Sequence, residues 1–185
     1  SEIAYGVEQT LSAGYVDNYI GYWGTWYQGI AKTNKAIDCL RKFGQMSDED
    51  KARLEAEIKF VRASLYFDLM KRYKEIIIYD ENLDAYTKDK AYSTEEEGWD
   101  FVYNDLKFAA DNLPARESAN GRINKGMAWA FMTRAMLYAE RWDVVKTAAE
   151  EVEKLGYGLE ENYADSYSVA IGSGNNEAII QYQFD

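Results

Sequence analysis

The 185-residue chain contains no histidine and a single cysteine. The absence of histidine excludes a catalytic triad that uses histidine and a metal site with imidazole ligands. The single cysteine, Cys39, excludes an intrachain disulfide and a zinc site built from several cysteines. Because Cys39 lies within a helical pattern, we expect it to be a small core residue. We therefore expect neither a metal nor a cofactor.

Long hydrophobic runs are also absent. No stretch approaches the roughly 18 apolar residues that a membrane-spanning helix needs. The first residues, Ser-Glu-Ile-Ala, lack the basic and hydrophobic regions of a signal peptide. These absences fit either a cytoplasmic protein or a trimmed fragment of a longer one.

Positive charge is scarce. The chain has 21 Lys and Arg residues against 32 Asp and Glu residues, which gives a net charge of −11. Nucleic-acid binding depends on clustered basic side chains, and so does docking on anionic lipid, so we expect neither partner. The hydrophobic content of 47% and the length predict one folded domain over residues 1–185.

Apolar residues recur three or four positions apart in five stretches, as on one face of an α-helix. We expect helices over about 22–43, from Ser47 to Tyr73, from a capping box at 93–96 to just before Pro114, over 125–141 and over 143–155. In the second helix, the expected buried stripe is Leu54, Ile58, Val61, Leu65, Leu69 and Tyr73. Residues 1–20 predict an irregular lead-in, and residues 178–182 predict a strand or an extended segment.

Short loops between these stretches predict antiparallel helix pairs. The fourth and fifth stretches place small residues, Ala135 and Ala148, where two helices would approach closely. This arrangement resembles a degenerate tetratricopeptide unit, in which stacked helix pairs form a curved scaffold. We therefore expect a mainly all-α fold of about five helices in tetratricopeptide-like antiparallel pairs, with irregular or short extended terminal segments.

Motifs that could carry chemistry are weak. The sequence Asp80-Glu81-Asn82-Leu83-Asp84 begins like a calcium loop, but Ala85 and Ala91 stand where that loop needs Gly and Glu. The glycines around Trp23 lack the Lys-Ser/Thr of a phosphate-binding loop. The acidic clusters at 48–50 and 95–97 lie at expected helix starts, where capping explains them. No nucleophile is paired with a base, so we expect no enzymatic activity.

Aromatic residues are abundant, with 16 Tyr, 5 Trp and 7 Phe. Tyr and Trp rings can stack on flat apolar ligand faces while their polar atoms form hydrogen bonds. Those outside or at the start of the first helical stripe are the candidate ligand-binding residues: Tyr5, Tyr15, Tyr19, Tyr22 and Trp23.

Two polar residues, Asn34 and Arg62, lie on or near apolar helix faces. A buried polar group without a partner costs about 1–3 kcal/mol, so each should bond to a neighbouring helix. We interpret both as structural links between helices, with a role in ligand binding as the alternative.

The segment Lys51–Tyr73 closely resembles a signature helix of the SusD/RagB family. The family pattern is an acid, an aromatic, a hydrophobe, Arg-Ala, an aromatic pair and Asp-Leu, and the matching residues here are Glu57, Phe60, Val61, Arg62, Ala63, Tyr66, Phe67, Asp68 and Leu69. Further matches follow in family order at 26–37, 102–114, 121–138 and 176–180. One departure follows Tyr73, where Lys74-Glu75-Ile76-Ile77 replaces the Gly-Asp-hydrophobe-Pro turn that is frequent in the family.

The resemblance covers about residues 22–185 and implies a fragment of a longer protein. It implies a cell-surface lipoprotein of the outer membrane of Bacteroidota-type bacteria, held by a lipid anchor that this chain lacks. Such a protein captures glycans, without catalysis, for a SusC-like TonB-dependent transporter. The alternatives that remain are a helical-repeat scaffold that binds only protein and a peptide-binding RagB-like protein.

Overall fold

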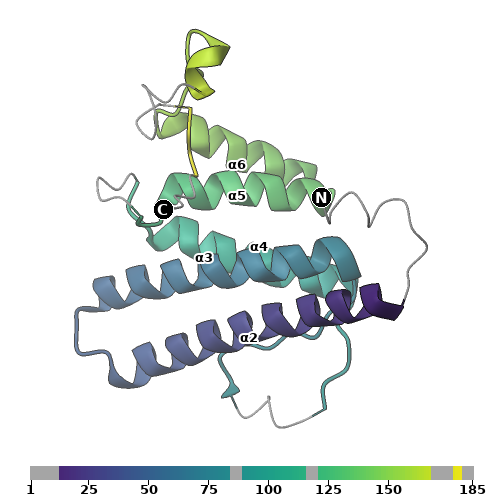
Figure 1. Ribbon diagram of the computed structural model, residues 1–185. Helices are drawn as coiled ribbons and strands as arrows, with labels where there is room; N and C mark the ends of the chain where they lie inside the picture. The colour runs from purple at the N-terminus through teal and green to yellow at the C-terminus, as the bar shows by residue number, and fades with distance from the viewer. Residues whose placement is uncertain (1–12, 84–88, 116–120, 168–176, 181–185) are drawn as a thin grey trace.

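The computed structural model describes residues 13–83, 89–115, 121–167 and 177–180 (Figure 1). Within these ranges, the secondary structure is helical and contains no strand. The helices are α2 (Ala13–Phe43), α3 (Asp48–Tyr73), α4 (Glu95–Asn112), α5 (Lys125–Tyr138), α6 (Trp142–Lys154) and the 3₁₀ helix η2 (Tyr163–Tyr167). None of the helices in the described part of the chain is long and apolar enough to cross a membrane.

Successive helices run antiparallel and lie side by side from α2 to α6 (Figure 1). Each of them packs against the next helix in the chain, and α3 also contacts α5. The predicted all-α fold of five helices in antiparallel pairs is therefore confirmed.

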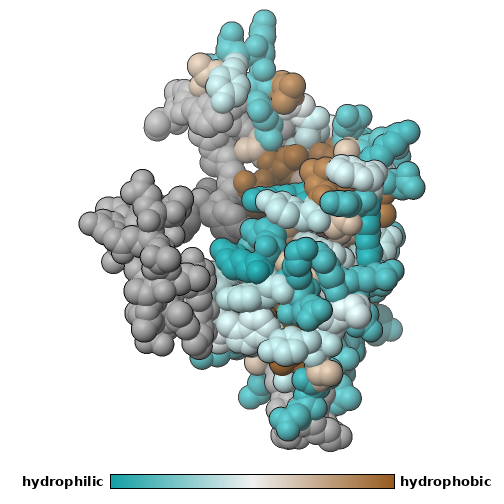
Figure 2. Space-filling view, turned by 90° about the vertical axis from the view of Figure 1, so that its right-hand side faces the viewer, coloured by the Kyte–Doolittle hydropathy of each residue, from teal (hydrophilic) through white to brown (hydrophobic). Residues whose placement is uncertain are grey.

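Figure 2 shows the face at which α3 and α5 end and α4 and α6 begin. Hydrophilic residues cover much of it, and hydrophobic ones gather in its upper part, where α5 and α6 lie.

The second helix begins as predicted, but the start of the next one differs by one residue. The backbone N–H of Asp50 donates to the Ser47 hydroxyl at 3.1 Å, which caps α3. At α4 the cap is Thr94 rather than Ser93. The Glu97 N–H donates to the Thr94 hydroxyl at 3.2 Å, and the Thr94 N–H donates to the Glu97 carboxylate at 2.8 Å. The capping box is at 94–97, one residue later than predicted. The Ser93 backbone N–H donates to the Ile76 carbonyl and is not available to a carboxylate of the helix.

The first helix is longer than predicted. It begins at Ala13, so residues 13–20 are helical rather than an irregular lead-in. Gly14, Gly21 and Gly24 lower the helix propensity of this stretch, but propensity is a weak constraint that tertiary context overrides. Helix α5 ends at Tyr138 and is shorter than the predicted 125–141, because Glu140 adopts a φ of 56° and turns the chain between α5 and α6.

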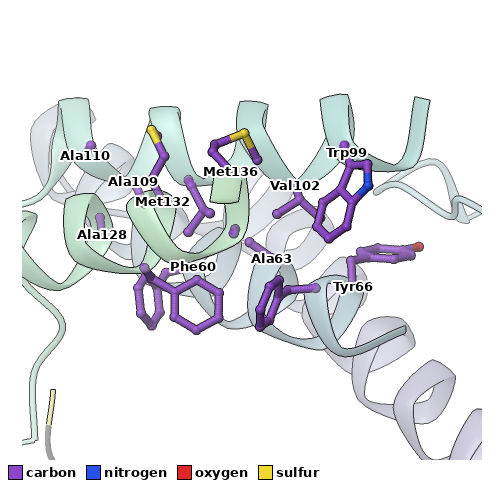
Figure 3. Packing of buried hydrophobic residues seen from close by; sticks show 14 of the residues in the cluster. Phe60, Ala63, Tyr66, Trp99, Val102, Ala109, Ala110, Ala128, Met132 and Met136 are labelled. Carbon is purple, nitrogen blue, oxygen red and sulfur yellow. The ribbon is translucent and has the colours of Figure 1, made fainter. Parts of the chain in front are cut away.

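Helix α3 lies at the centre of the core, and its buried face differs from the predicted stripe. Val61 is 41% exposed, whereas Phe60, Ala63, Phe67 and Met70 are buried. The reason is that α3 contacts α2, α4 and α5, so its buried residues spread around the helix instead of following one stripe. Figure 3 shows the core residues of α3 facing those of α4 and α5: Phe60, Ala63, Tyr66, Trp99, Val102 and Met132.

Two glycines permit close contacts in this core. A Cβ atom at Gly98 of α4 would collide with the Met70 side chain of α3, and one at Gly126 of α5 would collide with the Tyr157 ring. The Tyr157 hydroxyl also donates to the Asn124 side chain at 3.3 Å. The segment after α6 is thereby held against the start of α5.

Two further predictions need correction or lie partly outside the described residues. Cys39 is exposed rather than a core residue, because the inward positions nearby on α2 are Asn34 and Ile37. Residues 177–180 form no strand, and residues 181–182 lie outside the described ranges.

Candidate functional site

After α3 the chain runs without regular secondary structure through residues 76–80, and tyrosine side chains hold this segment. The Tyr27 hydroxyl of α2 donates to the Ile77 carbonyl at 2.9 Å and accepts from the Ile77 N–H at 2.8 Å. Burial raises the pKa of this hydroxyl well above its ordinary value, against the opposing effect of its bond to Ile77. It therefore stays protonated and can make both bonds.

The same arrangement recurs two residues further on. The Tyr66 hydroxyl of α3 donates to the Tyr79 carbonyl at 2.9 Å and accepts from the Tyr79 N–H at 2.7 Å. The Asn34 side chain of α2 also donates to the Tyr79 carbonyl, at 2.8 Å. We call residues 76–81 the docked segment, because side chains of both α2 and α3 fix its main chain.

A hollow of about 370 Å³ lies between α2 and the docked segment. Its lining is mostly aromatic or aliphatic and consists of Trp23, Gly24, Tyr27, Gln28, Ala31, Ile77 and Tyr79. We call it the aromatic hollow. A pocket lined by rings with few polar groups suits a ligand that has a flat apolar face.

Trp23 connects the aromatic hollow to further rings. Its ring lies 4.8 Å from the ring of Tyr27 and 4.8 Å from that of Tyr73, measured between centroids. Tyr92, which is 65% exposed, lies edge-on to Trp23 at 6.4 Å. Trp23 is thus held by rings from three parts of the chain while it lines the hollow.

The predicted ligand-binding aromatics separate in the structure. Trp23 lines the aromatic hollow, whereas the Tyr22 ring stacks on Trp26 at 3.6 Å and lies 4.1 Å from the Arg72 guanidinium. The backbone of Tyr15 and Tyr19 belongs to α2, but their side chains, like all of Tyr5, lie outside the described residues.

The predicted structural pair, Asn34 and Arg62, is brought together beneath the docked segment. Arg62 is 2% exposed and donates to Asn34 at 2.5 Å. It also forms a bidentate ion pair with Asp105 of α4, with bonds of 2.7 and 2.8 Å. A bidentate guanidinium–carboxylate pair of this kind fixes orientation as well as charge. Arg62 therefore links α2, α3 and α4.

The ion-pair network extends to the docked segment through Glu81. This carboxylate accepts from Arg62 at 2.9 Å and pairs with Arg41 of α2 at 2.8 Å. Arg41 forms a second bidentate pair with Glu55 of α3. The charges therefore alternate in sign across three helices and the docked segment.

The electrostatics of this network follow from burial and pairing. Burial raises the pKa of the Glu81 carboxyl, but Arg62 and Arg41 outweigh it and lower that pKa to about 2. Burial likewise lowers the pKa of Arg62, whereas Asp105 and Glu81 raise it above its ordinary value. Burial raises the pKa of Asp105, and Arg62 opposes that effect.

Several residues of the site were not predicted as site residues. These are Tyr27, Ile77, Tyr79 and Glu81. The run of β-branched residues at 76–78, followed by Tyr79, was the available signal, because it is typical of extended chain that packs on an apolar surface. Among the described residues, no group of acidic or cysteine side chains could hold a metal ion.

Together these features define a tetratricopeptide-like helix-pair scaffold with an aromatic-lined hollow beside α2. The chain belongs to the SusD-like family: residues 4–137 match the family model described as "Starch-binding associating with outer membrane". It is 24% identical over 183 residues to a SusD-like protein of Bacteroides ovatus, an alignment that covers 91% of this chain and 33% of that protein.

Solved structures agree with the family. A SusD-like protein from Bacteroides fragilis aligns with a TM-score of 0.78 and 32% identity, over 89% of this chain and 33% of that one. A laminarin-binding SusD-like protein aligns with a TM-score of 0.72 and 24% identity, over 83% of this chain and 35% of that one. The chain thus spans about one third of the length of these relatives.

Proposed function

We propose that this chain is part of a cell-surface protein that binds glycans and has no catalytic step. The observation that carries the proposal is the aromatic hollow with Trp23 in its wall. Pyranose rings have an apolar face of C–H groups, and aromatic side chains stack on such faces while polar tips bond to hydroxyls. Gln28 also lines the hollow, and its side-chain amide can donate hydrogen bonds to sugar hydroxyls and accept them.

Similarity to known proteins supports the proposal. One structural relative is a laminarin-binding SusD-like protein, and the family model carries a starch-binding description. By analogy, the protein would act at the bacterial outer membrane and deliver oligosaccharides to a SusC-like TonB-dependent transporter. Tyr5, Tyr15, Tyr19 and Tyr22 remain proposed ligand contacts, by the same analogy with the family.

The charge of the chain refines the expected ligand. The chain has a net charge of −11, which disfavours an anionic ligand. The described residues that line the hollow include no acidic or basic side chain, so an anionic sugar has no ion-pair partner among them. We therefore expect neutral glycans to bind more tightly than glycans rich in uronic acids.

Calorimetric titration of the chain with neutral and acidic glycans tests this function. We expect binding of a neutral glucan such as laminarin, and we expect Trp23→Ala to weaken it about tenfold, or about 1.4 kcal/mol. Trp142→Ala is the matched control, because Trp142 is 63% exposed on α6 and does not line the hollow. Equal affinity of both variants would remove the hollow from the site, and binding to a peptide but no glycan would favour the RagB-like alternative.

A further inference from the structure

The docked segment forms one wall of the aromatic hollow, yet no regular secondary structure holds it. Its main chain is fixed by side chains instead. The Tyr27 and Tyr66 hydroxyls each bond both the N–H and the carbonyl of one residue, Ile77 and Tyr79 respectively. These are alternate residues, so their side chains lie on the same side of an extended chain.

That side is the one that faces the hollow. Ile77 and Tyr79 both line it, whereas Ile76 is fully buried in the core. A shift of one residue in the docked segment would exchange these faces and put Ile76 and Ile78 at the wall. The register of the segment therefore decides which side chains a ligand meets.

Tyr66 fixes this register from outside the site. It is fully buried, it does not line the hollow, and its ring lies 6.5 Å from that of Tyr27. Its bonds to Tyr79 span 13 residues of the chain, and those of Tyr27 to Ile77 span 50. Two hydroxyls on two different helices thus hold the wall at two points.

We propose that Tyr66 is a positioning residue for ligand binding, and that its hydroxyl holds Tyr79 in the register that forms the wall of the aromatic hollow. This proposal rests on the proposed glycan-binding function for its consequence but not for its geometry. Tyr66→Phe removes the hydroxyl and keeps the ring, so the Tyr79 N–H loses its partner while the core stays filled.

The first test is amide hydrogen exchange, which needs no ligand. In Tyr66→Phe we expect the Tyr79 amide to exchange roughly tenfold faster than in the unmodified chain, the effect of one lost hydrogen bond. The Ile77 amide, bonded to Tyr27, should change much less. Tyr27→Phe should show the reverse pattern. Uniform acceleration across α3 in Tyr66→Phe would overturn the proposal, because it would indicate general destabilisation.

The second test is affinity for laminarin, measured by calorimetry. We expect Tyr66→Phe to bind about three- to tenfold more weakly. Tyr157→Phe is the matched control, because it also removes a tyrosine hydroxyl with a side-chain partner, Asn124, but lies away from the hollow. Unchanged affinity in Tyr66→Phe, with Trp23→Ala still weakened, would overturn the positioning role. Absence of glycan binding by the unmodified chain would overturn the proposed function, and exchange at Tyr79 would still decide the register claim.

Discussion

Single side chains set the shape of this site, and Glu81 shows how. Its carboxylate is shared by Arg62, which is buried, and Arg41, which is partly exposed. Each arginine also holds a second carboxylate, Asp105 or Glu55, by a bidentate pair. Glu81 is therefore the residue through which the docked segment joins the ion pairs of α2, α3 and α4.

This role predicts a pH-dependent contribution to stability. The pKa of Glu81 is about 2 in the folded chain and about 4.3 in an unfolded one, so the folded state binds fewer protons. Its contribution, of about 2–3 kcal/mol, is thus complete above pH 5 and is lost as the pH falls toward 2. We expect Glu81→Gln to lower the free energy of unfolding by that amount at pH 7 and by roughly half as much at pH 3.

Urea denaturation of both chains at the two pH values measures this difference. Glu160→Gln, at a partly exposed acid outside the network, is the control. A difference between Glu81→Gln and the unmodified chain that is the same at pH 3 and pH 7 would contradict the assignment.

The sequence predicts some residues of the site better than others. Asn34 and Arg62 were singled out because they are polar on apolar helix faces, and the structure brings them within 2.5 Å. Trp23 was selected among the aromatics at the start of the first helix, and it lines the hollow. Tyr79 and Glu81 were not, because their partners lie 13 to 45 residues away in sequence and no local pattern records such contacts.

At the scale of the element, the hydroxyls of Ser93 and Thr94 at the start of α4 differ in their hydrogen bonding. Thr94 forms the capping box with Glu97, whereas the Ser93 hydroxyl is buried without a hydrogen-bond partner among the described residues. We expect Thr94→Ala to lower the free energy of unfolding by about 1 kcal/mol, and Ser93→Ala to change it by less than about 0.5 kcal/mol. Thermal unfolding followed by circular dichroism measures both, and a larger loss from Ser93→Ala would restore the cap to position 93.

The end of α3 carries backbone strain. Lys74 has φ 58° and ψ −58°, and the Glu75 N–H donates to the Tyr73 carbonyl at 2.6 Å, which is the hydrogen bond of a classic-type γ-turn. Such a conformation costs a residue with a Cβ roughly 1–3 kcal/mol. The lysine side chain is largely exposed, and its ion pair with Glu95 contributes little.

Lys74→Gly should therefore raise the free energy of unfolding by about 1 kcal/mol, because relief of strain exceeds the added entropy of the unfolded chain. Glu75→Gly, at the exposed neighbouring position where φ is not positive, should lower it by about 0.5–1 kcal/mol. Chemical denaturation of the two variants checks the contrast. Equal destabilisation would show that the turn at Lys74 is not strained.

The sequence predicted the existence of the helices better than their buried faces and their ends. Periodicity located the five helices, because each has an apolar face toward a neighbour. It predicted the buried face of α3 poorly, because a helix with neighbours on several sides has no single stripe. Helix ends were shifted where a tertiary bond intervened, as at Ser93, whose N–H is bonded to Ile76.

At the scale of the whole molecule, one connected cluster of buried residues extends from α2 to α6. Phe131 of α5 joins its parts, because its ring lies 5.5 Å from Phe60 and 5.2 Å from Phe67 of α3. Helices that share one core should unfold together. We therefore expect a single transition in which helical signal and tryptophan fluorescence have the same midpoint.

Phe131→Ala should lower the free energy of unfolding by about 3–5 kcal/mol and shift both midpoints together. Phe131→Leu, which keeps most of the buried volume, should cost much less. Urea titration followed by tryptophan fluorescence and by the helical signal measures both midpoints. A variant in which fluorescence and helical signal separate would show that α2 to α4 and the pair α5 and α6 unfold as independent units.

The base of the loop after the docked segment has a consequence for how such a protein can diversify. The Ser93 N–H bonds to the Ile76 carbonyl, and Glu81 is held by two arginines, so both ends of the stretch between 81 and 93 are fixed. Doubling the length of such a stretch adds only about 0.6 kcal/mol of closure cost. An insertion in this stretch leaves the bonds of Tyr27 and Tyr66 to the wall of the hollow in place, so the length of the chain here can change on an unchanged frame.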